Sequence, residues 1–132
     1  MDITDKLYQE ALKILPNAYA PYSKFKVAAA IYADNGKICT GCNVENISFP
    51  CGTCAEAGAI SNMITNGGKR ILEILIISDN NEIITPCGAC LQRIAEFADN
   101  DTIITIANNK GIQKHLHLRE LLPHCFQTEK LK

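Results

Sequence analysis

Two short stretches, CAE at residues 54–56 and PCGAC at residues 86–90, bring three thiols and one carboxylate into a short chain. Each stretch has the composition of the first turn of a helix. Thr53 suits the N-cap position before an Ala-rich run, and Pro86 suits position N1, where the missing N–H of proline costs nothing. The positive end of a helix dipole lowers the pKa of a cysteine and favours the metal-binding thiolate. The two stretches therefore predict two helix starts that face each other across a metal site.

Cys54, Cys87 and Cys90 supply three sulfur ligands for one Zn²⁺ in this interpretation. Three protein ligands leave one tetrahedral position open for water, which is the arrangement of catalytic zinc. Glu56 lies two residues after the first ligand and can take the proton of that water. The alternative for Glu56 is an ordinary first-turn acid that the helix dipole favours. Together these residues predict a hydrolytic zinc enzyme.

A second zinc arrangement uses Cys51 as well. Cys51 and Cys54 have the same spacing as Cys87 and Cys90, so the four thiols are also candidates for a structural, non-catalytic zinc site. Zinc ribbons usually separate their cysteine pairs by about 15–20 residues, whereas a predicted helix and strand lie between these pairs. The remaining thiols are interpreted as small buried core residues, namely Cys39, Cys42 and Cys125.

The bulk composition is that of an ordinary globular chain. With 132 residues, 47% of them hydrophobic and 20% charged, we expect one domain over residues 1–132 with its own core. The net charge of −1 gives no electrostatic basis for binding nucleic acid or an anionic membrane, and it favours a small substrate. Seven cysteines without a secretory leader favour the cytoplasm.

Hydrophobic periodicity predicts helices and strands that alternate along most of the chain. The expected helices cover residues 3–15, 54–65, 86–97 and 118–122, and the expected strands cover 25–32, 37–43, 71–78 and 102–107. ADNG at 33–36 predicts a hairpin between the first two strands, and the apolar run at 71–78 predicts a strand buried on both faces. This order predicts a mixed sheet, antiparallel at its start and parallel later, with helices on both faces. Ligands collect at the carboxyl ends of such strands, where both motif helices begin.

Three motifs, NVEN at residues 43–46, CAE and PCGAC, occur in an order that resembles the small homo-oligomeric zinc-dependent cytidine deaminases of pyrimidine salvage. The resemblance extends from SKFKVAAAI at 23–31 to LLPHCF at 121–126. It implies a three-layer α/β/α fold with a mixed five-stranded sheet, one Zn²⁺ per subunit and a homotetramer. It also implies hydrolytic deamination of cytidine or deoxycytidine to uridine or deoxyuridine and ammonia through a zinc-bound hydroxide. Glu56 then carries the water's proton to N3 of the pyrimidine and later protonates the leaving amino group.

The same resemblance assigns roles to residues around the metal site. Asn43 and Glu45 match residues that hydrogen-bond the ribose 3′-hydroxyl. Phe25 matches an aromatic residue that stacks on the pyrimidine, and Ala55 matches a position whose backbone N–H contacts O2. From the residues alone, a turn-forming Asn, a solvated Glu and a core Phe stay open as alternatives. Two further aromatic residues match positions that complete the active site of a neighbouring subunit, namely Phe49 and Phe126.

The chain departs from the usual pattern of that family beside the metal site. An Arg commonly follows the catalytic Glu and another follows PCGAC, whereas this chain has Ala57 and Leu91 at these positions. Three thiolates carry more negative charge than Zn²⁺ neutralises, so nearby cations or N–H dipoles are needed to keep the metal a useful Lewis acid. The helix starts supply part of this charge, and Arg93 supplies more if it faces the site and not solvent. Because of this departure, a modified or antibiotic cytosine nucleoside is an alternative substrate.

Overall fold

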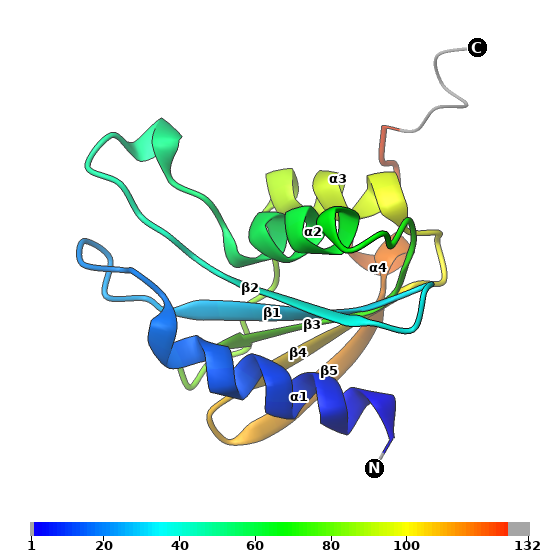
Figure 1. Cartoon of the computed structure of the whole chain (residues 1–132), viewed down its shortest axis with the longest axis horizontal. Helices are drawn as coiled ribbons and strands as arrows, with labels where there is room; N and C mark the ends of the chain where they lie inside the picture. The colour runs from blue at the N-terminus through cyan, green and yellow to red at the C-terminus, as the bar shows by residue number, and fades with distance from the viewer. Residues whose placement is uncertain (1, 127–132) are drawn as a thin grey trace.

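The computed structural model describes residues 2–126, which form a central sheet with helices on both faces (Figure 1). The expected domain's ends, residue 1 and residues 127–132, lie outside the described residues. In chain order the elements are α1 (Ile3–Ile14), the 3-10 turn η1 (Leu15–Asn17), β1 (Val27–Ala33), β2 (Ile38–Cys42), the 3-10 turn η2 (Phe49–Cys51), α2 (Ala55–Thr65), β3 (Ile71–Ser78), α3 (Gly88–Phe97), β4 (Ile103–Asn108), β5 (Gly111–His117) and α4 (Leu118–Leu121).

The sheet has five strands in the order β2-β1-β3-β4-β5. β1 is antiparallel to both β2 and β3, β3 is parallel to β4, and β4 is antiparallel to β5. The expected three-layer α/β/α fold with a mixed five-stranded sheet is therefore confirmed. The predicted hairpin between β1 and β2 is also confirmed, since their register runs from Ala28 opposite Cys42 to Tyr32 opposite Ile38.

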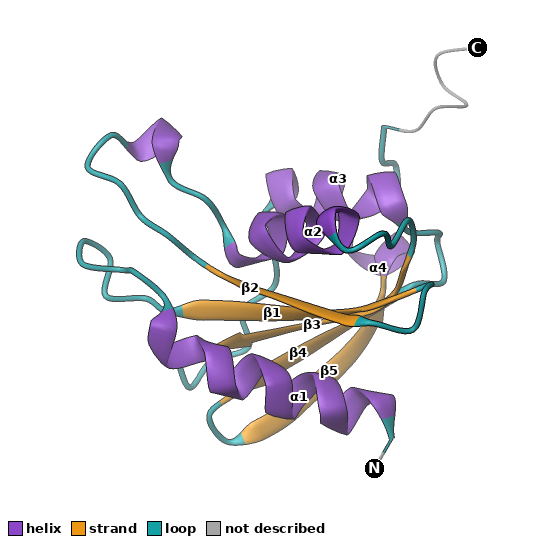
Figure 2. Ribbon diagram, viewed as in Figure 1, coloured by secondary structure: helices purple, strands orange, loops and turns teal. Residues whose placement is uncertain are grey.

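The two faces of the sheet carry different helices, as Figure 2 shows. On one face α1 packs through Leu7 and Ala11 against residues that include Leu75 and Ile77. On the other face α2 and α3 cover a larger core built around side chains such as Ile74, Ile76, Ile94 and Ile104. β3 contributes to both cores, which agrees with its continuous apolar sequence.

Small residues bring the helices close to the sheet. Ala28 and Ala30 of β1 belong to the core under α1, while Ala29 belongs to the core under α2 and α3, and all three are fully buried. The tightest approach is between β2 and the first turn of α2. A Cβ atom on Gly41 would collide with the backbone nitrogen of Ala59 and would lie 2.6 Å from the carbonyl oxygen of Ala55. Only glycine fits at this position without a shift of the helix.

The strand β5 was not predicted from the sequence. Its segment, Gly111–His117, is an edge strand whose central residues Gln113, Lys114 and His115 are exposed. These polar residues have no hydrophobic alternation that periodicity could detect. The strand forms because the turn after Asn108, with Gly111 at φ +123°, returns the chain antiparallel to β4.

A projecting loop, residues 43–53, leaves the sheet after β2 and returns to the start of α2 (Figure 1). Its base is closed by hydrogen bonds of 2.9 Å in both directions between the backbones of Val44 and Thr53. The backbone of Tyr19 lies on its other side and bonds to Asn43 and Glu45, each at 2.9 Å. Among the described helices, none has the length and apolar character required to cross a membrane.

Candidate metal centre

Two cysteines occupy the N-cap positions of the motif helices. Cys54 caps α2 and Cys87 caps α3, each in an extended backbone conformation. The predicted N-cap Thr53 is therefore wrong by one residue, and Pro86, predicted at N1 of α3, lies two positions before the first residue of that helix, Gly88. Thr53 is instead held in a β-bridge with Val44, which keeps the chain extended up to Cys54. Both cap sulfurs consequently lie at the positive end of a helix dipole.

The structure brings the three predicted sulfur ligands together. The Sγ atoms of Cys54, Cys87 and Cys90 all lie within 4.8 Å of one another. Two sulfur ligands of one tetrahedral Zn²⁺, each about 2.3 Å from the ion, are about 3.8 Å apart. The observed spacing fits one ion after a small adjustment of the side chains, and the thiolate donor set is one that Zn²⁺ favours.

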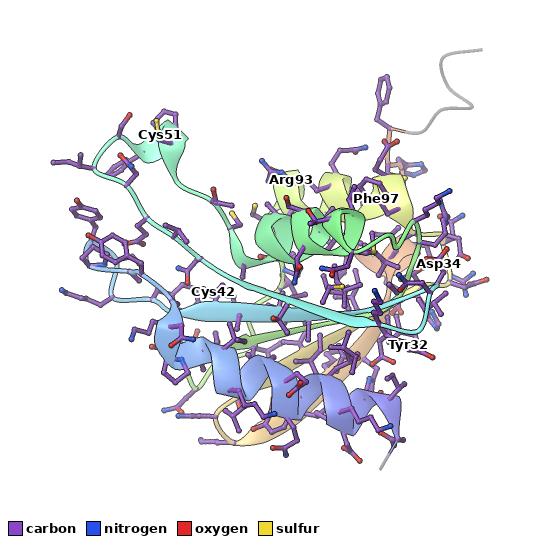
Figure 3. All side chains as sticks on the ribbon, viewed as in Figure 1. Tyr32, Asp34, Cys42, Cys51, Arg93 and Phe97 are labelled. Carbon is purple, nitrogen blue, oxygen red and sulfur yellow. The ribbon has the colours of Figure 1, made fainter. Side chains whose placement is uncertain are left out.

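Cys51 is not part of this cluster. Its side chain is exposed and its Sγ lies 3.5 Å from the hydroxyl of Ser48. Figure 3 shows Cys51 on the projecting loop, away from the α2 and α3 layer. The four-thiolate site considered from the sequence is therefore not supported by the described residues. Of the expected core thiols, Cys39 and Cys125 are buried and Cys42 is half-buried.

The three thiols differ in their surroundings. Cys87 is exposed, and the backbone N–H of Cys90 is the main cause that lowers its pKa. Cys90 is buried, and burial, reinforced by the negative charge of Glu56, raises the pKa of its thiol. Deprotonation of all three thiols therefore depends on positive charge at the cluster, which a bound Zn²⁺ would supply.

Glu56 lies in the first turn of α2 and is only 6% exposed. Burial raises the pKa of its carboxyl above the usual range, whereas hydrogen bonding with Cys90 and the positive charge of Arg93 act in the opposite direction. A carboxyl group can act as a general base and then as a general acid when it lies within reach of the reacting atoms. Its position beside the sulfur cluster is suited to proton transfer there.

A pocket of about 290 Å³ opens next to the sulfur atoms. The three cysteines, Glu56 and Ala55 form one side of it, and Phe25 and Asn43 lie on its wall. Ala55 follows the N-cap of α2, so its backbone N–H is one of the unpaired donors at the helix start. These are the residues that the resemblance assigned to the metal, the proton transfer and the pyrimidine.

Asn43 fixes the end of β2 to the start of β1. Its side-chain oxygen accepts a 2.9 Å hydrogen bond from the N–H of Val27, and its side-chain nitrogen donates a 2.9 Å bond to the carbonyl of Phe25. An amide side chain has two acceptor and two donor positions, so each atom of Asn43 can still bind a ligand hydroxyl. The sequence did not indicate this backbone clamp.

Glu45 lies outside the smaller pocket, in an adjoining one of about 500 Å³ that shares Asn43 and Cys54 with it. One oxygen of Glu45 accepts hydrogen bonds from the backbone N–H groups of Tyr22 and Ser23, at 3.0 and 3.1 Å. Hydrogen bonding with Ser23 is the main cause that lowers the pKa of Glu45. The carboxylate is thus held in its charged form beside the mouth of the metal site.

The two aromatic residues assigned to a neighbouring subunit are exposed in this chain. Phe49 on the projecting loop is 80% exposed and lines the larger pocket. Phe126 is 61% exposed, and its backbone forms two hydrogen bonds with the side chain of Gln92 on α3. Neither side chain is covered by the described part of the chain.

Two residues near the site carry features that the sequence did not resolve. Ser78, the last residue of β3, lines the smaller pocket, and its buried hydroxyl has no hydrogen-bond partner among the described residues. Arg93 on α3 points toward the metal cluster, and its Nη1 donates a hydrogen bond of 3.6 Å to Sγ of Cys90. Figure 3 shows Arg93 on the layer formed by α2 and α3. The position of Ser78 at the carboxyl end of a central strand was the one available signal for its role in the pocket wall.

Comparisons with known proteins agree with this geometry. Residues 1–106 match the family described as the cytidine and deoxycytidylate deaminase zinc-binding region. The chain is 37% identical over 131 residues to a cytidine deaminase of Sporosarcina psychrophila, covering 99% of this chain and 96% of that protein. It is 35% identical over 123 residues to a cytidine deaminase of Halalkalibacterium halodurans, covering 93% of each.

Solved structures give the same result for the fold. The crystal structure of cytidine deaminase from Burkholderia pseudomallei superposes with a TM-score of 0.87 at 34% identity, covering 96% of this chain and all of that chain. The crystal structure of cytidine deaminase from Mycobacterium tuberculosis gives a TM-score of 0.81 at 31% identity, covering 96% of this chain and 99% of that chain.

Proposed function

The chain belongs to the cytidine and deoxycytidylate deaminase family, and we propose that it is a zinc-dependent hydrolase that converts cytidine to uridine and ammonia at the pocket beside Cys54, Cys87 and Cys90. The observation that carries this proposal is the cluster of three sulfur atoms within 4.8 Å of one another, with the buried carboxyl of Glu56 beside it. The proposal includes deoxycytidine as a second substrate.

Cys54, Cys87 and Cys90 hold one Zn²⁺ in this proposal. When bound, the ion supplies Lewis acidity and lowers the pKa of water toward neutrality. The cysteines fix the ion to two helix starts on the same side of the sheet. Because the described cluster provides three thiols and no fourth protein ligand, one position stays available for chemistry.

Glu56 moves the protons. Its carboxylate accepts a proton from the attacking water and delivers it to N3 of the pyrimidine, which makes C4 more electrophilic. Glu56 then takes the second proton, from the hydroxyl now on C4, and gives it to the amino group, so that the C4–N bond breaks, ammonia departs and the C4 carbonyl forms. Burial raises the pKa of Glu56, which favours the protonated form from which the carboxyl can donate.

The pocket wall orients the nucleoside. We assign Phe25 to stacking on the pyrimidine and the backbone N–H of Ala55 to O2, because both line the pocket that contains Glu56. We assign Asn43 and Glu45 to the ribose 3′-hydroxyl. Their support is that Asn43 lines both pockets and Glu45 lines the adjoining one, so a sugar that spans the junction meets both side chains.

We propose that the active unit is a homotetramer of single-domain chains, residues 1–132, in which Phe49 and Phe126 contact the site of a neighbouring copy. The support is the exposure of apolar side chains around the site: Ile47 and Phe49 are each 80% exposed, and Phe126 is 61% exposed. Ile47 and Phe49 lie two residues apart on the projecting loop, and exposed apolar patches mark protein contacts. Seven free cysteines suit the reducing cytoplasm, where we place the protein in pyrimidine salvage.

One ultraviolet assay tests the central proposal. Zinc-loaded protein mixed with cytidine should abolish the cytidine absorbance band and release an equal amount of ammonia, with one zinc per chain. The same assay on deoxycytidine and on modified cytosine nucleosides ranks the substrates. Turnover of a modified nucleoside alone would replace cytidine as the substrate, and zinc binding without turnover of any of them would refute the proposed reaction.

A further inference from the structure

We propose that Arg93 is a positioning cation of the metal site, acting through the thiolate of Cys90. This inference rests on the proposed function, since it concerns the metal centre of that reaction. Arg93 and Cys90 lie on the same face of α3 at i and i+3, and Nη1 of Arg93 donates to Sγ of Cys90 at 3.6 Å. A sulfur acceptor permits a longer hydrogen bond than an oxygen does, so 3.6 Å is within range. Because the guanidinium donor is charged, the hydrogen bond is charge-assisted.

The charge of Arg93 is not neutralised by a carboxylate in the described part of the chain. Within residues 2–126 the ion pairs are those of Lys13 with Glu10 and of Arg119 with Asp101. Glu96 shares a surface groove with Arg93 but forms no ion pair with it over the same residues. The guanidinium therefore makes its hydrogen bond to the sulfur, while its positive charge also opposes, without an ion pair, the rise that burial causes in the pKa of the nearby Glu56 carboxyl.

The groove explains how the side chain reaches the metal site. Ala57 and Ser61 of α2 line it on one side, and Arg93, Glu96 and Phe97 of α3 line it on the other. The small side chain of Ala57 leaves room for the guanidinium between the two helices. Arg93 does not line the pocket of about 290 Å³ where the nucleoside would bind, so it cannot act by touching substrate.

The need for such a cation follows from the charge of the ligands. Three thiolates more than neutralise a divalent ion, and each added negative charge weakens its action as a Lewis acid. The helix starts at Cys54 and Cys87 offer partial positive charges to two of the sulfurs. Cys90 is the third residue of α3 and shares that helix start with Cys87, but its side chain is buried. Arg93 supplies a further positive charge to this third sulfur and draws electron density away from it.

The test compares the full-length protein with three variants. Arg93→Met removes the charge and the donor but keeps a long side chain in the groove, and Arg93→Gln keeps an N–H donor without the charge. Arg119→Met is the matched control, since it removes an exposed arginine of another helix whose ion pair is with Asp101. Each protein is loaded with Zn²⁺ for chelator competition and for kinetics with cytidine, and with Co²⁺ for absorption spectroscopy.

For Arg93→Met we expect zinc affinity or kcat to fall by roughly 10–100-fold, the usual effect of losing a partner of a metal ligand, with a small change in KM. We also expect the sulfur-to-cobalt charge-transfer bands to move to longer wavelength, because a thiolate without its hydrogen bond gives up electron density more readily. Arg93→Gln should show a smaller shift, and Arg119→Met should match the wild type in all three measurements.

An unchanged cobalt spectrum and unchanged zinc affinity in Arg93→Met would overturn the inference, even if the variant melts earlier, because they would reduce Arg93 to a packing residue. If Arg93→Met does not fold, the cobalt spectrum and zinc affinity of Arg93→Gln decide the question by the same criterion. The proposed function fails in a different way: the wild type would bind metal without deaminating any cytosine nucleoside. The cobalt spectra would still decide the role of Arg93 in that case.

Discussion

Glu56 and Glu73 are almost equally buried, at 6% and 7% exposure, but lie in opposite kinds of surroundings. Glu73 on β3 accepts hydrogen bonds of 2.9 Å from the hydroxyls of Thr4 and Thr105, under α1. Glu56 lies on the other side of the sheet beside three thiols and a pocket. Burial alone therefore does not identify a catalytic carboxyl group. The distinguishing property is whether its oxygens are committed to the protein or directed to a cavity.

The largest effect is expected from a variant that cannot hold the metal in the cluster beside Glu56. Cys87→Ala should lose stoichiometric zinc and all measurable cytidine turnover, because two thiols do not hold the ion in an open site. Metal analysis after dialysis and the ultraviolet assay measure the two effects. Cys51→Ala is the matched control and should retain both zinc and activity. Zinc loss in Cys51→Ala would instead support the alternative zinc site with four thiolate ligands.

The next test removes the proton carrier and keeps the metal. Glu56→Gln preserves the shape of the side chain but cannot shuttle a proton, so turnover should fall by at least about 10²–10⁴-fold. The zinc content should stay at one per chain. Steady-state kinetics and metal analysis on the same preparation check this prediction, and turnover near that of the wild type would remove Glu56 from the mechanism.

On the other face of the sheet, loss of Glu73 should reduce stability and leave activity unchanged. Glu73→Leu should lower the free energy of unfolding by about 1–3 kcal/mol, because it removes the carboxylate that accepts hydrogen bonds from the hydroxyls of Thr4 and Thr105. The Thr105 hydroxyl is then left with Nδ1 of His115, at 3.0 Å. The folded variant should keep its zinc and its turnover at room temperature. Urea denaturation measures the loss.

A double variant provides the control for that loss. Replacing both partners by apolar residues, as in Glu73→Leu with Thr105→Val, should recover part of the stability, since the buried hydroxyl that lost its carboxylate acceptor is then absent as well. A loss of turnover in folded Glu73→Leu would show that the two glutamates are not separated in function as their surroundings suggest.

The smallest effect is expected at Ser78, whose buried hydroxyl has no partner among the described residues. Ser78→Ala should leave the free energy of unfolding unchanged or raise it by up to about 1 kcal/mol, because no protein hydrogen bond is lost. Thr105→Ala is the comparison, since it removes a hydroxyl that is bonded to Glu73 and should destabilise. A clear destabilisation by Ser78→Ala would reveal a hydrogen bond that the geometry does not contain.

Short sequence patterns predicted the elements whose structure depends on residues that are neighbours in the chain. The apolar run of β3 and the turn at residues 33–36 determine a buried strand and a hairpin wherever they occur. Spacing and helix-start composition predicted a cysteine metal site but left Cys51 open as a fourth ligand, and the family resemblance favoured the set of Cys54, Cys87 and Cys90. The errors at Thr53, by one residue, and at Pro86, by two, arose because Cys54 and Cys87 themselves take the cap positions.

Other features depend on contacts between distant segments and had no local signal. β5 forms only because β4 offers a free edge to a polar segment. The direction of Arg93 depends on how α3 is rotated against α2, and the sequence left it open between the site and solvent. The hydroxyl contacts of Glu73 join residues 69 and 32 positions apart, which no periodicity reports.

The close approach of β2 to α2 at Gly41 affects how far the metal-site residues of α2 lie from those of α3. α2 brings Cys54 and Glu56, α3 brings the other two sulfurs, and β2 presses on the first turn of α2 at Gly41. A methyl group there would push α2 outward and separate its cysteine from the pair on α3. Position 41 therefore limits which mutations the enzyme can accept during evolution. A library randomised at this one codon and selected for cytidine turnover should return glycine alone.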